Sequence, residues 1–346
     1  MNKQKDSHTL RSKFFIPSRL LQSVVWGYAV LVLAACGVLY LLGDRWWPAT
    51  ILLFGPRWLA ALPLAVLVPF AFRLDRRLLV PLLFAALIVF GPFMGLCVPH
   101  GKTGTASSST IRVVACNIQG GNFNKSAFSA LIQETRPDII ALQECPREIG
   151  NLLPTGWQLV QEGGLAILSR YPLTYGGKLQ SMHPPHKWPR DCLLYGTVKL
   201  PAGDITVATV HLPSPRYGLQ HILDRRTGIN LARTGLLVKE TDHRAETARK
   251  VQQAVPSGGN VLVLGDFNTP SESTIYRRTW DRYVNAFGKT GAGYGYTERV
   301  SIGGVSFGVR IDHVLTGAGL VPRVCEVGPD VGSDHLPVIA DLAVKR

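Results

Sequence analysis

The feature that most limits how this chain can fold is the crowding of apolar residues into its first hundred positions. Val24–Leu42 contains no charged side chain, and Leu78–Val98 is a second uncharged run, interrupted by Pro and Gly. A helix needs about 20 apolar residues to cross about 30 Å of hydrocarbon, so each run predicts a membrane span. Trp58–Phe72 lies between them and is apolar but shorter. We expect it to be a third span, shortened or tilted.

The distribution of Lys and Arg predicts the orientation of these segments, because basic loops are retained on the cytosolic side of a membrane. They cluster in the N-terminal arm, 1–23, and in the loop before the last span. These residues are Lys3, Lys5, Arg11, Lys13, Arg19, Arg73, Arg76 and Arg77. Three crossings then place everything after the last span outside the cytosol, which in a Gram-negative cell is the periplasm. If the middle segment is re-entrant or lies on the surface, the rest of the chain falls in the cytosol instead.

Composition divides the 346 residues into an anchor at 24–99, a linker at 100–110 rich in Gly, Ser and Thr, and a domain at 111–346. Half of the net charge of +14 lies in the first hundred residues, so the charge is a weak sign of nucleic-acid binding. The remainder favours the approach of an anionic substrate. The six cysteines show no CxxC and no zinc spacing. We expect free thiols, with disulfides left open.

The domain reads as many strands with few helices among them. Apolar, β-branched runs predict strands at Ile111–Cys116, Asp138–Leu142, Leu165–Leu168, Leu193–Leu200, Ile205–Leu212, Asn260–Leu264, Ile311–Leu315 and Leu336–Leu342. Helical spacing predicts helices at Lys125–Arg136, with Asn124 as its N-cap, and at Asp242–Val255. This order favours stacked sheets covered by helices, an α+β class.

Polar side chains stand at or beside the ends of these strands. They are Asn117, Glu144, His211, Asp266, Asn268, Asp312, Asp334 and His335. Taken singly, each has an ordinary explanation as an Asx turn, a helix cap, a solvated charge or a packed histidine. Strand ends in packed sheets meet at common edges, however, so the set can converge on one rim. Converging carboxylates predict a hard cation such as Mg²⁺, which takes oxygen ligands.

Seven segments in order carry a resemblance to a known family. They are IRVVACNIQ, PDIIALQE, LAILSRYPL, ATVHLP, VLVLGDFNTP, RIDHVL and SDHLPV. Together they resemble the successive motifs of the endonuclease/exonuclease/phosphatase superfamily of metal-dependent phosphoesterases, from about residue 110 to about residue 344. The resemblance implies a four-layer α/β/β/α sandwich of two mixed sheets, here preceded by three transmembrane helices that lie outside the match.

The resemblance also implies a metal site and a catalytic set. Glu144 resembles the main ligand of Mg²⁺ or Mn²⁺, helped by Asn117 and by Asp334. Asp266 would orient or deprotonate the attacking water, and Asn268 would hold a phosphate oxygen. Three residues complete the set: His335 on the scissile phosphate, Asp312 fixing its tautomer, and His211 as a donor or an acid for the leaving group.

Two arginines, Arg170 and Arg190, are candidates for contact with the substrate phosphate. The expected function is therefore a metal-dependent phosphoester hydrolase on the inner membrane, with the lipid bilayer as a partner and no protein partner. A phospholipid headgroup or another extracytoplasmic phosphoester is the leading substrate class. Two alternatives stay open, namely a membrane-anchored nuclease acting on DNA and a catalytically inactive binding scaffold.

Overall fold

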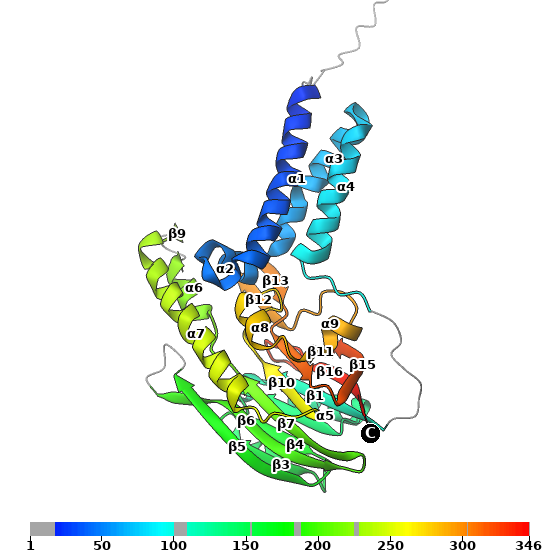
Figure 1. Cartoon of the computed structure of the whole chain (residues 1–346), viewed down its shortest axis with the longest axis vertical. Helices are drawn as coiled ribbons and strands as arrows, with labels where there is room; N and C mark the ends of the chain where they lie inside the picture. The colour runs from blue at the N-terminus through cyan, green and yellow to red at the C-terminus, as the bar shows by residue number, and fades with distance from the viewer. Residues whose placement is uncertain are drawn as a thin grey trace, which may run out of the picture.

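The computed structural model describes residues 18–99, 109–152, 154–182, 188–224, 228–302 and 304–345. It has two parts, a bundle of helices and, below it, a domain rich in strands (Figure 1). Residues 1–17 of the expected arm and residues 100–108 of the expected linker lie outside the described residues. Thr110, expected in the linker, opens the first strand instead.

Three helical stretches of the bundle are long and apolar enough to cross a membrane, Arg19–Leu41, Arg57–Leu74 and Arg76–Phe93. They run side by side in Figure 1. The regular helices are α1 (Ser18–Leu41), α2 (Trp47–Phe54), α3 (Leu62–Leu74) and α4 (Leu79–Ile88). Short turns are η1 (Gly43–Arg45), η2 (Arg57–Ala61), η3 (Arg76–Leu78) and the π-helical η4 (Val89–Phe93).

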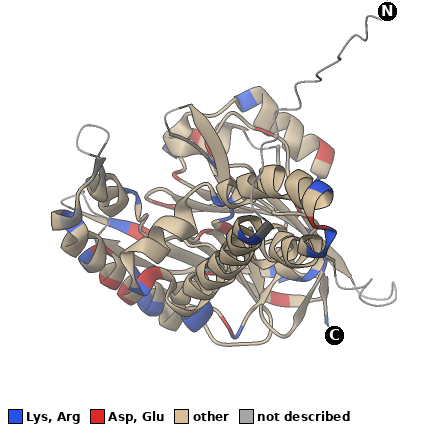
Figure 2. Cartoon of the chain, turned by 90° about the horizontal axis from the view of Figure 1, so that it is seen from above, with Lys and Arg blue, Asp and Glu red and all other residues tan. Residues whose placement is uncertain are grey.

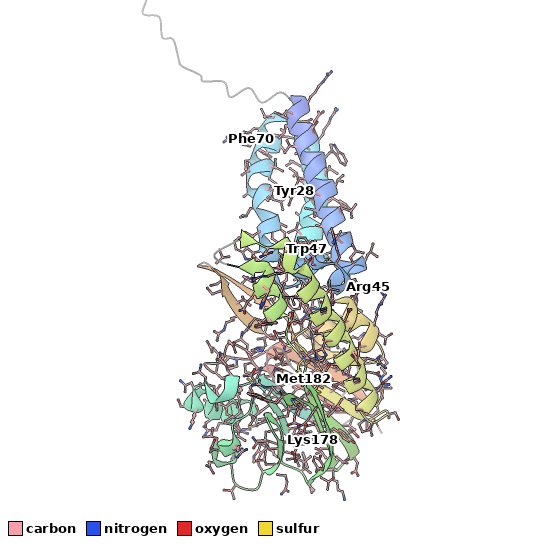
Figure 3. All side chains as sticks on the ribbon, turned by 90° about the vertical axis from the view of Figure 1, so that its left-hand side faces the viewer. Tyr28, Arg45, Trp47, Phe70, Lys178 and Met182 are labelled. Carbon is pink, nitrogen blue, oxygen red and sulfur yellow. The ribbon has the colours of Figure 1, made fainter. Side chains whose placement is uncertain are left out.

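The last stretch ends earlier than the apolar run suggests. Gly91 leaves helical dihedral angles inside η4, and Pro92 follows it. Cys97 instead pairs with Gly293 of the domain, through N–O distances of 2.8 and 3.0 Å. The end of the apolar run therefore joins the anchor to the domain. Trp47 opens α2 at this junction, where Figure 3 places it between Tyr28 in the bundle and the strands below.

The domain contains two six-stranded mixed sheets. The first has the order β15-β16-β1-β2-β4-β3 and the second has the order β11-β14-β10-β7-β6-β5. Strands of the first are β1 (Thr110–Asn117), β2 (Ile139–Gln143), β3 (Gln158–Glu162), β4 (Leu165–Ser169), β15 (Leu320–Val327) and β16 (Val338–Val344). Strands of the second are β5 (Leu173–Met182), β6 (Pro189–Leu200), β7 (Gly203–His211), β10 (Val261–Asp266), β11 (Val284–Asn285) and β14 (Asp312–Thr316). Each sheet has one parallel pair, β1 with β2 and β7 with β10.

Alternation along the strands builds the four expected layers. In β1, Val113 and Ala115 lie in the core between the two sheets, whereas Val114 and Cys116 pack beneath α5 (Lys125–Thr135). Helices α7 (Thr234–Ala254) and α8 (Thr274–Thr279) cover the outer face of the second sheet. Asn124 caps α5 as predicted, because its Oδ1 accepts a hydrogen bond from the Ala127 N–H at 3.1 Å.

Smaller elements complete the domain. They are η5 (Gln119–Gly121), η6 (Arg147–Leu152), α6 (Arg216–Ile222), η7 (Leu231–Arg233), α9 (Ala286–Thr290), and the hairpins β8 (Leu223–Asp224) with β9 (Gly228–Ile229) and β12 (Glu298–Ile302) with β13 (Val305–Val309). Figure 2 shows acidic and basic residues gathered on the helices at the left of the domain, and the sequence of α7 mixes both kinds. This helix starts before the predicted Asp242, because Leu237 and Thr241 extend its buried face. All six cysteines are free thiols, as expected.

Candidate active site

Strand register brings the polar residues of both sheets to one edge of the domain. Asp266 at the end of β10 stands directly opposite His211 on one side and Asp312 on the other. In the first sheet, Asn117 ends β1 beside the end of β2, and Glu144 follows β2. The parallel pairs β1–β2 and β7–β10 thus deliver their carboxyl ends to a common site.

Asp266 lies at the centre of this site and is 1% exposed. Its Oδ1 accepts a hydrogen bond from the Asn268 backbone N–H at 2.8 Å, and its Oδ2 accepts from the side-chain amides of Asn117 and Asn268, each at 3.1 Å. Burial raises the pKa of the Asp266 carboxyl, and the neighbouring charge of Asp312 adds to this against the opposing effect of His335. Asp266 is therefore a fixed, buried carboxyl with a raised affinity for a proton.

His335 is held between two buried carboxylates. Its Nδ1 lies 2.9 Å from Asp312 Oδ2 and its Nε2 lies 3.9 Å from Asp266 Oδ2. Burial by itself disfavours the charged ring, but Asp312 and Asp266 outweigh it and raise the pKa of His335 well above its ordinary value. The hydrogen bond to Asp312 holds the ring so that Nε2 lies on the side of Asp266.

Glu144 and His211 form the more open side of the site. The Glu144 side chain is 37% exposed, and its Oε1 lies 3.4 Å from Asn117 Nδ2 and 3.8 Å from His211 Nε2. His211 Nε2 is also 3.6 Å from Asp266 Oδ2. Glu144 adopts a left-handed φ of +50°, which is uncommon for a non-glycine residue and directs its side chain away from the line of β2.

The two remaining expected residues lie in adjoining loops. Asn268 has φ +48°, and its side-chain amide donates to the Leu212 carbonyl at 2.8 Å as well as to Asp266. Asp334 is half-buried, between Ser333 and His335, which are both buried. The Ser333 hydroxyl donates to the Asn117 carbonyl at 2.7 Å, which ties this loop to the end of β1.

The two arginines expected at the substrate differ in position. Arg170 follows β4, which is antiparallel to β2, so it lies at the end of the sheet away from Glu144. Its guanidinium packs over the Trp157 ring at 5.6 Å, and the structure does not bring it to the cluster. Arg190 is exposed in β6, beyond the pairing of Leu193 with Val210, and so lies towards the edge that carries His211.

One carboxylate near the site was not expected from the sequence. Glu298 opens β12, and its backbone forms an isolated antiparallel β-bridge with that of His335. Its side chain accepts a hydrogen bond from Arg216 at 2.9 Å. Its side chain is 13% exposed, and burial raises the pKa of its carboxyl. It lies in the segment YTERV, whose residues carry no recognisable spacing, so only the three-dimensional structure could find it.

A comparison with known proteins identifies the family of the chain. The model of the Endonuclease/Exonuclease/phosphatase family matches residues 114–335, more than half of the chain. The chain belongs to the endonuclease/exonuclease/phosphatase family. Members of this family are hydrolases that act on phosphoesters and typically depend on a divalent metal. The anchor lies outside the matched residues.

Several solved structures are similar to this chain at low sequence identity. A humanized zebrafish (D. rerio) TDP2 is 17% identical with a TM-score of 0.50, over 68% of this chain and 100% of that chain. An endonuclease/exonuclease/phosphatase from Beutenbergia cavernae is 18% identical with a TM-score of 0.47, over 68% and 72%. The human Nocturnin catalytic domain is 16% identical with a TM-score of 0.45, over 68% and 95%. A search of curated proteins found no match.

Proposed function

We propose that this family member is a membrane-anchored hydrolase that uses Mg²⁺ or Mn²⁺ to cleave a phosphoester by attack of water. The observation that carries the proposal is the contact of Asp266 with Asn117, together with the placement of His211 and His335 within 4 Å of the same Asp266 oxygen. One carboxyl, two imidazoles and an amide thus surround a single point at which a phosphoryl group and a water can be held.

The donor set of the site fits a hard divalent cation. Glu144 is the ligand we propose, because Mg²⁺ keeps several waters and a part-exposed carboxylate leaves room for them. Asp334, which is half-buried in the loop before His335, stays a proposed further ligand. A second set, Asp266, Asp312 and His335, has ligand atoms within 4.8 Å of one another. Hydrogen bonds already occupy Asp266 and join His335 to Asp312, so we assign this set to catalysis. When bound, the cation neutralises charge on a phosphoryl oxygen.

The protein side chains supply the remaining chemistry. Asp266 is placed to orient the water and to accept its proton, since a raised pKa makes a carboxylate a better base. His335 and His211 present ring N–H groups where negative charge develops on the phosphoryl oxygens. Asn268 donates to Asp266 and to the Leu212 carbonyl, so we assign it to orienting Asp266 rather than to holding a phosphate oxygen. Arg190 stays a proposed contact for the substrate.

The position of the site favours a substrate at the membrane surface. Asp44 lies in η1, just after α1, and its carboxylate contacts Ser273 and Ile275 in the segment that follows Asp266. The catalytic edge of the domain is therefore the edge that meets the anchor. The phosphoesters of lipid headgroups lie at the membrane surface, next to this edge of the domain, which supports a phospholipid headgroup as the substrate class.

The bundle supports three crossings with the domain outside the cytosol. Gln22 Nε2 lies 3.3 Å from Asp75 Oδ2, so the start of α1 and the α3–α4 turn are at the same end of the bundle. That end carries Arg73, Arg76 and Arg77, whereas the domain end carries Arg45 and Arg57, and Arg57 is paired with Glu272. By the positive-inside rule we propose that the far end faces the cytosol and that the domain lies outside it, which in a Gram-negative cell is the periplasm. A fluorescent cytosolic reporter fused after Arg346 should stay dark, and a bright one would contradict this orientation.

A substrate panel tests the proposed function. The full chain in lipid nanodiscs, with Mg²⁺ or Mn²⁺, should hydrolyse bis-p-nitrophenyl phosphate and release a headgroup from the phospholipids of the disc. EDTA and Asp266→Asn should each abolish the activity. Preference for plasmid DNA over lipid would replace the lipid substrate by the nuclease alternative. A folded protein with no hydrolysis of any of these esters would contradict the enzyme and favour the scaffold.

A further inference from the structure

The anchor and the catalytic edge meet at a buried carboxylate, Asp44. It is 4% exposed, although it follows directly on a predicted membrane span. Its Oδ2 accepts hydrogen bonds from the Ser273 hydroxyl, from Thr274 Oγ1 at 3.4 Å and from the Ile275 N–H at 3.3 Å. Its Oδ1 lies 3.5 Å from Arg244 Nη1. A buried charge needs a partner: the charge of Arg244 lies within ion-pair distance, although the facing atoms, Oδ1 and Nη1, form no hydrogen bond among the described residues, and Oδ2 carries the hydrogen bonds.

Arg244, the partner of Asp44, clamps two catalytic loops. It lies in α7 and is 2% exposed. Its Nε donates to the Pro213 carbonyl at 3.1 Å, in the loop that follows His211, and its Nη2 donates to the Asn268 carbonyl at 2.8 Å. One guanidinium thus ties together the ends of β7 and β10. A lysine could not do this, because it lacks the rigid fork of N–H donors.

The Asn268 carbonyl, which accepts from Arg244, belongs to a residue that contacts Asp266 directly. Asn268 is in the left-handed region at φ +48°, a conformation that persists only when its surroundings hold it. In this conformation its backbone and side-chain amides both donate to Asp266. Release of the carbonyl by Arg244 would let Asn268 relax and would move the oxygens of Asp266.

A second ion pair ties the anchor to the same segment. Arg57 of η2 is 3.5 Å from Glu272 Oε2 and donates to the Phe93 carbonyl at 3.0 Å. Glu272 Oε1 is 3.8 Å from Arg310 Nη2, and Arg310 comes shortly before Asp312. Asp44 and Arg57, the buried charged residues of the anchor among those that the structure describes, therefore both contact the segment between Asp266 and α8.

We propose that Asp44 of the membrane anchor is a positioning residue for catalysis, acting through Arg244 on the Asn268 carbonyl and thereby on Asp266. The anchor is then a structural part of the active site in addition to a tether. This proposal rests on the hydrolase function proposed above. The proposal goes beyond that function, because it assigns a catalytic effect to a residue of the anchor, outside the residues that match the family model.

The test compares Asp44→Asn with wild type in the full chain, in nanodiscs, with bis-p-nitrophenyl phosphate. The substituted side chain keeps an acceptor for Ser273 and Ile275 but lacks the charge that faces Arg244. A catalytic group displaced by about 1 Å can lose about 100-fold in rate, so we expect kcat to fall by about 10- to 100-fold. The soluble substrate does not contact the anchor, so we expect KM to change by less than about threefold.

Two anchor contacts that do not reach the catalytic loops provide matched controls. Tyr294 OH donates to the Phe90 carbonyl at 3.1 Å, and the Arg277 guanidinium lies 5.5 Å from the centre of the Tyr40 ring. Tyr294→Phe and Arg277→Ala should leave kcat unchanged. An equal loss in the controls would show that Asp44 acts only through general stability of the junction and would overturn the proposal.

A double-mutant cycle tests the route through Arg244. Arg244→Lys should lower kcat, and adding Asp44→Asn to it should lower kcat little further, because both changes release the same carbonyl. Additive losses would contradict the route. If Asp44→Asn does not fold, Asp44→Glu takes its place, because it keeps the charge but displaces it by one methylene. A fall in kcat at unchanged KM in the folded protein would support the positioning role, and wild-type kcat would contradict it. Inactive wild type would refute the hydrolase itself, whereas active wild type with fully active Asp44→Asn would refute only the positioning role.

Discussion

The hydrogen bond between His335 and Asp312 makes the most demanding prediction about catalysis. The two side chains are 6% and 1% exposed, and the Nδ1–Oδ2 distance is 2.9 Å. Asp312→Asn keeps an oxygen that can accept from Nδ1 but removes the negative charge. The other oxygen, Oδ1, is buried without a hydrogen-bond partner among the described residues, so the exchange breaks no second contact.

The size of the effect follows from the distance. Two unit charges 2.9 Å apart in a medium of effective dielectric constant about 20 attract by about 6 kcal/mol. Part of this attraction is offset, because an uncharged contact between His335 and the asparagine of the Asp312→Asn variant costs less to bury than an ion pair. If about half remains, transition-state stabilisation falls by about 3 kcal/mol, which corresponds to a loss in kcat of about 100-fold.

Steady-state hydrolysis of bis-p-nitrophenyl phosphate by the full chain, at saturating Mg²⁺ or Mn²⁺, measures this loss. Asp281→Asn, at an exposed position outside the cluster, is the matched control and should retain wild-type kcat. Thermal unfolding of each variant separates catalysis from folding. A correctly folded Asp312→Asn protein with kcat within about threefold of wild type would refute the role assigned to the pair.

Three further results are expected. Asn124→Ala should lower the free energy of unfolding of the domain by about 1 kcal/mol, through loss of the α5 cap, with kcat unchanged; chemical denaturation measures this, and no change would argue against the cap. Arg170→Ala should leave kcat and KM within about twofold of wild type, because the side chain packs over Trp157 away from the site; a large loss would place Arg170 back at the substrate. Burial opposes ionisation of Glu272, but Arg57 and Arg310 outweigh burial and lower the pKa of its carboxyl. The ionised carboxylate therefore stabilises the fold above the usual glutamate pKa of about 4.3, and this stabilisation is lost as the pH falls from there through the lowered pKa. Glu272→Gln should flatten the acid limb of the curve of unfolding free energy against pH, and an unchanged limb would contradict the role of Glu272.

The sequence predicts the two-sheet fold of the domain well because its motifs and its strands coincide. Val113 and Val114 belong to one apolar run, and the period of two that sends them to opposite faces of β1 is a local property. Asp266 and Asn268 follow a strand in a segment that resembles a family motif, so their neighbourhood is expected from the resemblance. The apolar spans are equally local, since they depend only on length and composition.

What the sequence does not predict depends on contacts between distant segments. Glu298 reaches the site only because β12 forms a bridge to His335, and no spacing indicates this. Asp44 looks like a solvated loop charge until Arg244, far along the chain, is placed beside it. Arg170 shows the converse. Its segment resembles a family motif, but Arg170 follows β4, which runs antiparallel to β2, and so it lies at the end of the sheet away from Glu144.

Binding of Mn²⁺, followed by electron paramagnetic resonance on the full chain, tests most directly whether these scattered side chains surround one cation. Wild type should bind Mn²⁺ in the site, Glu144→Gln should weaken its affinity at least about tenfold, and Glu148→Gln, at an exposed position in η6, should bind as wild type does. Equal affinities in wild type and Glu144→Gln would contradict a metal centre at Glu144.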